Sequence, residues 1–323
     1  MSASARRTEL TATVCVCAYT MDRWDVLGAT IQACLEQMRD GDELILVADH
    51  APRLQEAAAA RFPQARVIPN THARGLSGAR NSAVRASSTD VLVFLDDDAV
   101  PCAGWLDELL EPYAAPQVVG VGGWVQPAWP DKAPSWLPPE FLWVVGCSYE
   151  GLPKQRAPIR NPIGANMSFR SAVFAQVGLF SESLGRVGTL PVGCEETELG
   201  IRVGRHYGPD AILHQPSACV EHRVTPVRSQ RRYFYQRCWS EGRSKAAVSR
   251  SVGRDRALAS ERSYVTRTLP AALARELRSA SRGNTDALAR AATIPLGALV
   301  SAVAYFSYSR ALRSPHLRPR SAG

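Results

Sequence analysis

Several patterns that would point directly to a function are missing from this sequence. It has no Walker phosphate loop, and residues 120–125 (GVGGWV) lack the third glycine of a dinucleotide-binding fingerprint. A phosphate-bearing ligand is therefore not held by a glycine-rich loop. The eight cysteines contain no CxxC pair, and the N-terminus lacks the charged, apolar and small-residue order of a signal peptide. We expect a cytoplasmic protein with reduced, mostly buried thiols.

Negative charge is scarce in the C-terminal part of the chain. From residue 223 onward there are 20 Lys and Arg against 5 Asp and Glu, a net charge of +15, whereas residues 1–222 carry 18 basic and 25 acidic residues, a net of −7. This asymmetry indicates an anionic partner, and an anionic membrane surface or a nucleic acid would each fit. A set of soluble, arginine-rich helices would give the same composition.

Length and apolar content suit one main domain with appendages, since the chain has 323 residues of which 46% are hydrophobic. Apolar runs alternate with helical spacings along the first part of the chain, which predicts βαβ units and a parallel sheet. The expected strands are 11–18, 43–48, 65–68 and 91–95, and the expected helices are 24–38, 54–62 and 79–86.

The pattern changes after this first part. Residues 112–165 are rich in Pro, Gly and Trp, which predicts strand pieces and long loops that could line a ligand groove. A short helix, a longer helix, a late strand and a basic helix are then expected at 174–177, 195–207, 220–224 and 230–250. We expect an α/β domain over residues 1–250, with an open, mostly parallel sheet flanked by helices.

The remaining residues 251–323 predict a basic helical extension. Its apolar segment, 292–308, is shorter than the roughly 20 residues that span a bilayer. Because Arg290 and Arg310 flank this segment, it fits either an interfacial helix or a helix docked on the core. Peripheral contact with the cytoplasmic face of a membrane is one expectation, and an enzyme without such contact is the other.

The feature richest in chemistry is a triple aspartate, Asp96, Asp97 and Asp98, directly after the apolar run 91–95. Five consecutive apolar residues are typical of a strand buried on both faces. Three adjacent carboxylates repel one another, and solvent, Arg or Lys partners, or a bound cation relieves the repulsion. Open α/β sheets bind ligands at the carboxyl ends of their strands, which favours a Mg²⁺ or Mn²⁺ site on a diphosphate. A solvated acidic turn is the alternative.

A second acidic cluster begins the helix expected at 195–207. Glu198 can pair with Arg202 one turn later, which explains it structurally. Glu195 and Glu196 have no such local partner, so either could act as a general base, although acidic residues also stabilise helix N-termini. His222 lies on a short β-like run; it could be a packing residue or could complete the cation site of Asp98, a mixed set compatible with Mn²⁺.

Together these features resemble the inverting family 2 glycosyltransferases of the GT-A fold. The resemblance covers about residues 11–245, and its motifs occur in the same order as in the family. They are AYT (18–20) with Arg23, the strand ending at Asp49, RGLSGARN (74–81), FLDDDAVP (94–101), GANM (164–167), EETEL (195–199) and His222. It implies a metal-dependent enzyme with a DXD motif that uses a nucleoside-diphosphate sugar.

The resemblance also implies roles for individual residues. Asp49 would contact the nucleotide base and Arg80 the base or the phosphates. Asp96 would contact the ribose, and Asp98 would hold the divalent cation. Glu196 stands where the family more often has a catalytic Asp, and Glu195 is its rival. The implied donor-binding residues are Thr20, Arg23, Asp49, Arg74, Arg80, Asp96 and Asp97; the implied acceptor-binding residues are Gly164, Ala165, Asn166, Arg237 and Trp239.

A narrower similarity involves WLPPEF (136–141), VGC (145–147), RNPIGAN (160–166) and residues 235–245. These look like the glucosyl-dolichyl-phosphate glucuronosyltransferases of archaeal lipid-linked glycan assembly. A glycan or polyprenyl-linked acceptor is therefore expected, and Arg231, Arg232 and Arg237 could hold an anionic acceptor head group or a uronate. The rival readings are a nucleotidyltransferase, which would need no base at Glu196, and a non-catalytic membrane or nucleic-acid binding module. No nucleic-acid-reading motif is visible, and we expect no such partner.

Overall fold

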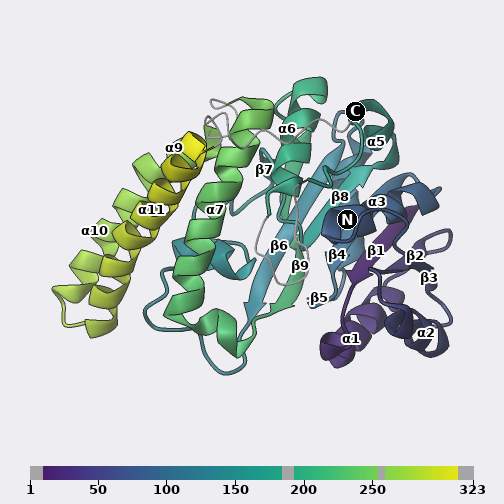
Figure 1. Cartoon of the computed structure of the whole chain (residues 1–323), viewed down its shortest axis with the longest axis horizontal. Coiled ribbons are helices and arrows are strands. Elements are labelled where there is room, and N and C mark those ends of the chain that lie inside the picture. The colour runs from purple at the N-terminus through teal and green to yellow at the C-terminus, as the bar shows by residue number, and fades with distance from the viewer. Residues whose placement is uncertain (1–9, 184–192, 254–258, 312–323) are drawn as a thin grey trace, which may run out of the picture.

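The computed structural model describes residues 10–183, 193–253 and 259–311. One mixed sheet forms its centre, with the strand order β3-β2-β1-β4-β8-β6-β9-β5, and β7 also pairs with β9 (Figure 1). The strands are β1 (Ala12–Ala18), β2 (Glu43–Ala48), β3 (Arg66–Pro69), β4 (Val91–Asp96), β5 (Ala99–Pro101), β6 (Gly120–Ala128), β7 (Ala157–Pro158), β8 (Asn166–Arg170) and β9 (Ile212–Arg223).

The predicted βαβ half of the sheet is confirmed. Strands β3, β2, β1 and β4 pair in parallel, and the helices between them are α1 (Trp24–Leu35), α2 (Pro52–Arg61) and α3 (Leu76–Ala86). The other half is mixed, because β8 runs antiparallel to both β4 and β6 while β6 and β9 are parallel. The Pro- and Gly-rich segment thus contributes β6 and β7, which periodicity alone does not define.

Alternating residues of the central strands form two cores. In β4, Val91, Val93 and Leu95 pack on one side, where α1, α2 and α4 (Trp105–Leu110) lie. Leu92 and Phe94 pack on the other side with α3, α5 (Ser171–Val177) and α6 (Glu195–Tyr207). The five apolar residues of β4 are at most 2% exposed, so this strand is buried on both faces, as predicted.

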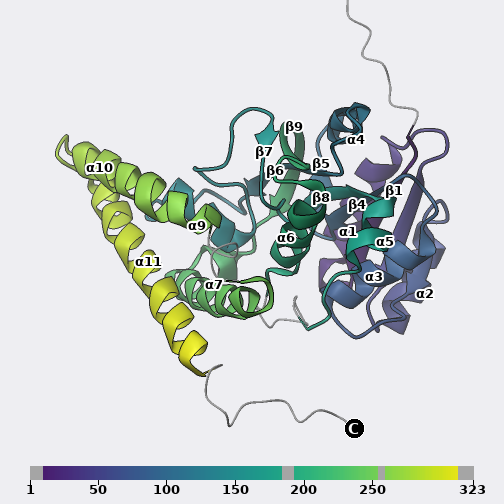
Figure 2. The ribbon, with the colours of Figure 1, turned by 90° about the horizontal axis from the view of Figure 1, so that it is seen from above.

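The C-terminal helices lie at the end of the molecule farthest from α2 (Figures 1 and 2). They are α7 (Arg231–Val252), α9 (Ala259–Ser263), the π-helical turn η5 (Tyr264–Thr268), α10 (Leu269–Ala280) and α11 (Thr285–Ala311). Helices α7, α10 and α11 and the turn η5 share a separate apolar cluster with the 3₁₀ helix η3 (Pro139–Val145). At Gly242 of α7, a Cβ would lie 2.2 Å from the Ser301 carbonyl oxygen of α11, so only glycine permits this close helix crossing.

Helix α11 is longer than the apolar segment predicts, because 27 residues are helical without a break. The prediction that this segment is too short to span a bilayer is therefore wrong on length. Among the described helices, α11 alone is long and apolar enough to cross a membrane, and 33% of its most apolar window is buried. Length and composition of this kind also occur in core helices of soluble proteins.

Candidate active site

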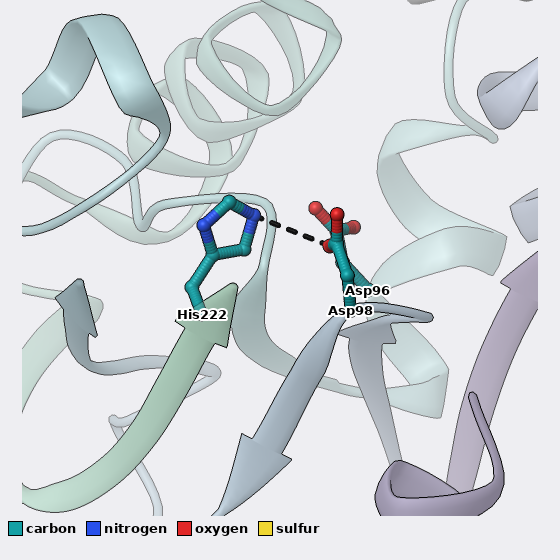
Figure 3. A group of neighbouring side chains, drawn as sticks. All are labelled: Asp96, Asp98 and His222. Carbon is teal, nitrogen blue, oxygen red and sulfur yellow. Dashed lines mark ion pairs between the residues drawn. The ribbon is translucent and has the colours of Figure 1, made fainter. Parts of the chain in front are cut away.

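The aspartate triplet lies where β4 ends and the chain turns into the short strand β5. The antiparallel pairing of β5 with β9 sets Ala99 opposite His222, and the Arg223 amide donates to the Asp98 carbonyl over 2.8 Å. Two segments far apart in sequence are thereby joined next to the triplet. Figure 3 shows the His222 ring facing the carboxylates of Asp96 and Asp98 across the end of the sheet.

Cationic side chains surround Asp97 and Asp98. The Arg23 Nη1 lies 2.6 Å from Asp97 Oδ1 and 3.0 Å from Asp98 Oδ2. His222 Nε2 lies 3.2 Å from Asp98 Oδ1, and Arg228 Nη2 lies 3.9 Å from Asp98 Oδ2. Burial alone would raise the pKa of Asp98, but these neighbours outweigh it and hold that pKa well below its usual range. Burial and the charge of Asp98 instead raise the pKa of Asp97 to about 7.

The same residues could hold a divalent cation. Asp96, Asp98 and His222 each offer one ligand atom, and these three atoms lie within 4.8 Å of one another. In the part of the chain that the structure describes, no hydrogen-bond partner reaches the buried Asp97 Oδ2, so this cluster has unused acceptor capacity. Two carboxylates and one imidazole form a mixed oxygen–nitrogen set that fits Mn²⁺, and the carboxylates also suit Mg²⁺. The donor set therefore fits the predicted metal.

Arg80 joins the two acidic clusters. From α3 its buried guanidinium reaches Asp96 Oδ1 at 3.3 Å and Glu195 Oε1 at 2.9 Å, and it donates to the Gly164 carbonyl over 2.9 Å. The aspartates and the glutamates are separate clusters in the sequence, and the structure brings them to one site. The glutamates, predicted to have no local partner, thus gain a distant one, because Arg80 pairs with Glu195.

The two glutamates at the start of α6 differ in environment. Glu195 is buried against Arg80, whereas Glu196 is partly buried and has no ion pair among the described residues. Burial and the nearby charge of Glu195 raise the pKa of Glu196 to about 8. A carboxylate with this pKa takes up a proton readily near neutral pH. The predicted pairing of Glu198 with Arg202 is confirmed at 2.8 Å.

The predicted donor residues Thr20 and Asp49 follow the carboxyl ends of β1 and β2, and Arg74 lies in the turn between β3 and α3. The Asp49 carboxylate accepts hydrogen bonds from Asn70 Nδ2 at 2.6 Å and from the Gly75 amide at 2.9 Å, so it holds the turn before α3. Arg74 is exposed, and its guanidinium donates to the His50 carbonyl over 3.4 Å. The Thr20 hydroxyl accepts from the Asp22 amide. Their contacts with a nucleotide stay predictions.

The predicted acceptor residues do not gather in one place. Asn166 is fully buried in β8; its side chain accepts from the Trp105 indole and donates to two backbone carbonyls, so its contacts here are structural. Gly164 and Ala165 lie beside Arg80 and the core. Arg237 is buried on α7, one turn before Glu241 and on the same helix face, whereas Trp239 is 43% exposed on another face.

Two groups near the site were missed by sequence reasoning. Arg228, in η4 (Pro226–Ser229), lies beside Asp98 and His222, although it belongs to a basic stretch with no motif around it. Lys245 of α7 pairs with Glu261 at 2.8 Å, and Arg160 pairs with Glu261 at 2.7 Å. This ionic network ties α9 to α7 and to the 160–166 loop, and long sequence separations hide it.

Comparison with known proteins agrees with this geometry. The family described as "Glycosyl transferase family 2" matches residues 13–178. The glucosyl-dolichyl phosphate glucuronosyltransferase of Haloferax volcanii is 30% identical over 239 residues, which is 73% of this chain and 76% of that protein. The chain belongs to glycosyl transferase family 2, and it is a glycosyltransferase.

Solved structures support the GT-A fold. A mannosyltransferase from Pyrobaculum calidifontis, in complex with GDP-Man and Mn²⁺, has a TM-score of 0.59 at 17% identity and covers 94% of this chain and 88% of its own. Glucosyl-3-phosphoglycerate synthase from Mycobacterium tuberculosis, in complex with Mn²⁺ and uridine-diphosphate, has a TM-score of 0.50 at 18% identity, covering 76% and 81%. At these identities the likeness shows the fold alone. The predicted α/β, GT-A class is thus confirmed.

Proposed function

We propose that this glycosyltransferase moves a sugar from a nucleoside-diphosphate donor, in a metal-dependent reaction that inverts the anomeric carbon. The observation that carries the proposal is Arg80, which connects Asp96 of the aspartate cluster to Glu195 of the glutamate cluster. A donor held at the aspartates would then lie within reach of the base at the start of α6. The Mn²⁺ complexes of the solved structures named above support the metal as an expectation.

The aspartate cluster is the proposed donor-diphosphate site. Asp96, Asp98 and His222 would hold Mn²⁺ or Mg²⁺, which supplies charge neutralisation to the departing diphosphate. Arg23 and Arg228 add positive charge next to the same carboxylates. Fixed cationic groups of this kind stabilise charge that develops as the sugar–phosphate bond breaks. Asp96 keeps its proposed ribose contact, since it is the most exposed of the three carboxylates.

Glu196 is the proposed general base. Its carboxylate removes the proton from the acceptor hydroxyl as that hydroxyl attacks the anomeric carbon from the face opposite the diphosphate. A single displacement of this kind inverts the anomeric configuration. Glu195 is less suited to the same task because its carboxylate is buried and pairs with the Arg80 guanidinium at 2.9 Å.

We further propose a polyprenyl-linked or glycan acceptor and a hexose or hexuronate as the transferred sugar. The glucosyl-dolichyl phosphate glucuronosyltransferase from Haloferax volcanii supports this acceptor, because its name specifies a dolichyl phosphate and the match covers most of both chains. Arg237 lies on the α7 face that meets the start of α6, where Gly193 donates to Ser244. Its charge is therefore well placed to attract an anionic head group or a uronate.

Contact with an anionic membrane is part of the same proposal. One side of α11 exposes large apolar residues at helical spacing while the opposite side packs on α7 and η3. The exposed set is Leu288, Leu296, Leu299, Val303 and Phe306. Basic residues accompany it in the helical extension, which suits an interfacial helix at the cytoplasmic face of a membrane. We keep residues 1–250 as the catalytic domain and 251–323 as the extension that positions it.

A donor panel tests the enzymatic proposal. Purified protein is incubated with Mn²⁺, individual UDP- or GDP-sugars and a glucosylated polyprenyl phosphate, and mass spectrometry follows the nucleoside diphosphate and the extended lipid. We expect sugar transfer with one donor and none in excess chelator. Release of diphosphate from a nucleoside triphosphate would instead indicate a nucleotidyltransferase. NMR of the product's anomeric centre reports inversion or retention.

Vesicle co-sedimentation tests the membrane contact. We expect binding to phosphatidylglycerol vesicles, weaker binding to phosphatidylcholine vesicles, and loss of binding in Leu299→Asp/Val303→Asp. Ala60→Asp, an exposed position on α2 at the far end of the molecule, is the matched control and should bind normally. Equal sedimentation of the double variant and the wild type would contradict a role for α11.

A further inference from the structure

Two cysteines face each other across the edge of the sheet. The antiparallel register of β5 and β9 continues past Pro101, which pairs with Val220, to Cys102 and Cys219, and the Cys102 amide donates to the Cys219 carbonyl over 3.0 Å. Directly opposite residues of antiparallel strands have Cα atoms about 4.5 to 5.5 Å apart. Disulfides usually join Cα atoms about 4.4 to 6.8 Å apart. The backbone therefore already holds this pair at bonding distance.

The surroundings of this pair differ from those of most other cysteines. Cys102 and Cys219 are both partly exposed, whereas Cys15, Cys34, Cys147, Cys194 and Cys238 are buried. Neighbours of Cys219 on the same face of β9, Ser217 and Glu221, are exposed. A small oxidant in solution can therefore reach the pair without opening the core.

The two thiols also interact with each other. Burial, then the hydrogen bond and charge of Cys102, raises the pKa of Cys219 to about 12. Cys219 thus keeps its proton near neutral pH. Its sulfur lies within hydrogen-bond reach of Cys102, so it is in place to attack a sulfenic acid formed there, as a resolving cysteine does.

We propose that Cys102 and Cys219 form a reversible cross-strand disulfide when the protein meets a peroxide. The Cys102 thiolate attacks one oxygen of hydrogen peroxide, the O–O bond breaks, and a sulfenic acid and hydroxide form. The Cys219 sulfur then attacks the Cys102 sulfur, the S–O bond breaks and water leaves. Overall, two thiols give two electrons to one peroxide, which with their two protons yields two waters and one disulfide.

This disulfide would form close in the chain to Asp98 and His222, two of the proposed metal-binding residues. Asp98 lies four residues before Cys102, and His222 lies three residues after Cys219, on the same pair of segments. The bond would tie β5, a three-residue edge strand, covalently to β9. The Cβ atoms of such a pair are about 4.5 to 5.5 Å apart, and a disulfide brings them to about 3.8 Å, so the strands must approach each other. A strained, exposed disulfide is readily reduced, which makes the link reversible.

Peroxide titration followed by peptide mapping tests the proposal. The folded full-length protein is treated with hydrogen peroxide, its free thiols are alkylated, and mass spectrometry identifies the peptides. We expect a linked Cys102–Cys219 peptide that dithiothreitol separates, and a thermal unfolding midpoint about 5 °C higher in the oxidised protein. Cys102→Ser and Cys219→Ser should each lose both the link and the shift.

Cys17→Ser is the matched control, because Cys17 is also partly exposed but its register neighbours are Val47 and Asp96. This variant should form the link like the wild type. Alkylation of both Cys102 and Cys219 after peroxide treatment would overturn the proposal. A linked peptide that dithiothreitol does not separate would also overturn it, because the proposed link is reversible. The test needs no sugar donor, so its outcome is independent of the proposed transfer reaction.

Discussion

Asp98 and Glu196, one from each acidic cluster, have opposite local charge balances. Asp98 has three basic neighbours, Arg23, His222 and Arg228, and its pKa lies below the usual range. Glu196 lies beside the like charge of Glu195, and the pKa of Glu196 rises to about 8. Glu195 itself pairs with Arg80. The two clusters lie on either side of one guanidinium, so their difference comes from local partners.

This difference assigns separate tasks to similar side chains. A carboxylate that stays ionised at every working pH suits the holding of a cation and a diphosphate. A carboxylate whose pKa lies near the working pH suits proton removal, because it is both available as a base and a good proton acceptor. Pairs of titratable groups whose environments separate their pKa values are a recurring mark of acid–base sites.

The largest loss of transfer activity is expected from removing the charge of Asp98. Asp98→Asn keeps the side-chain volume but takes away one metal ligand and the partner of His222. We expect transfer to fall about 10³-fold and Mn²⁺ binding, measured by isothermal titration calorimetry, to be lost. Asp107→Asn, at an exposed side chain on α4, is the control and should bind Mn²⁺ normally. Full transfer activity in Asp98→Asn would contradict the division of tasks.

A somewhat smaller loss of transfer activity is expected from Glu196→Gln. An amide cannot accept the acceptor proton, so kcat should fall about 10²-fold or more while Mn²⁺ binding is unchanged. Glu198→Gln changes the same helical turn but disrupts the pair with Arg202, so it should reduce thermal stability rather than kcat. If Glu195→Gln lost kcat and Glu196→Gln did not, the base would be Glu195.

The pH profile sharpens the comparison. Since only the ionised Glu196 can act as a base, kcat/KM should rise about tenfold per pH unit below pH 8 and level off above it. The charge of Glu195 contributes to the raised pKa, so Glu195→Gln should move the rising limb to lower pH. A limb that stays near pH 8 in this variant would show that burial alone sets the pKa of Glu196.

Local patterns in the sequence were sufficient to predict the βαβ half of the fold. The apolar run of β4 and the helical spacing of α1 are short-range signals, and both elements occur as predicted. The mixed half depends on β8, which inserts between β4 and β6 although it lies more than 35 residues from each in the chain. No periodicity encodes such a pairing. For the same reason the packing of α11 on α7 and its full length were not predictable.

The site was predictable in its residue types but not in its connections. A triple aspartate after a buried strand and a glutamate cluster at a helix start are visible in any reading of the sequence. The contact between them through Arg80 spans 115 residues, from Arg80 to Glu195, and appears only when the fold is known. Arg228 carries no motif, and only the return of β9 to the edge of β5 places it beside Asp98.

The smallest predicted effect is a change in Mn²⁺ affinity, caused by the surplus of positive charge around Asp98. Arg228 is the most distant of its three basic neighbours, at 3.9 Å, and it also lies 3.5 Å from His222 Nε2. A bound Mn²⁺ would be repelled by this guanidinium, so Arg228→Gln should tighten Mn²⁺ binding in the absence of donor by about fivefold, equivalent to about 1 kcal/mol. With the donor bound, the same charge stabilises the diphosphate, so the variant should lose kcat.

Calorimetry and initial rates measured on one preparation separate the two effects. Unchanged Mn²⁺ affinity would mean that solvent screens Arg228 from the site, and the surplus of fixed positive charge would then reduce to Arg23.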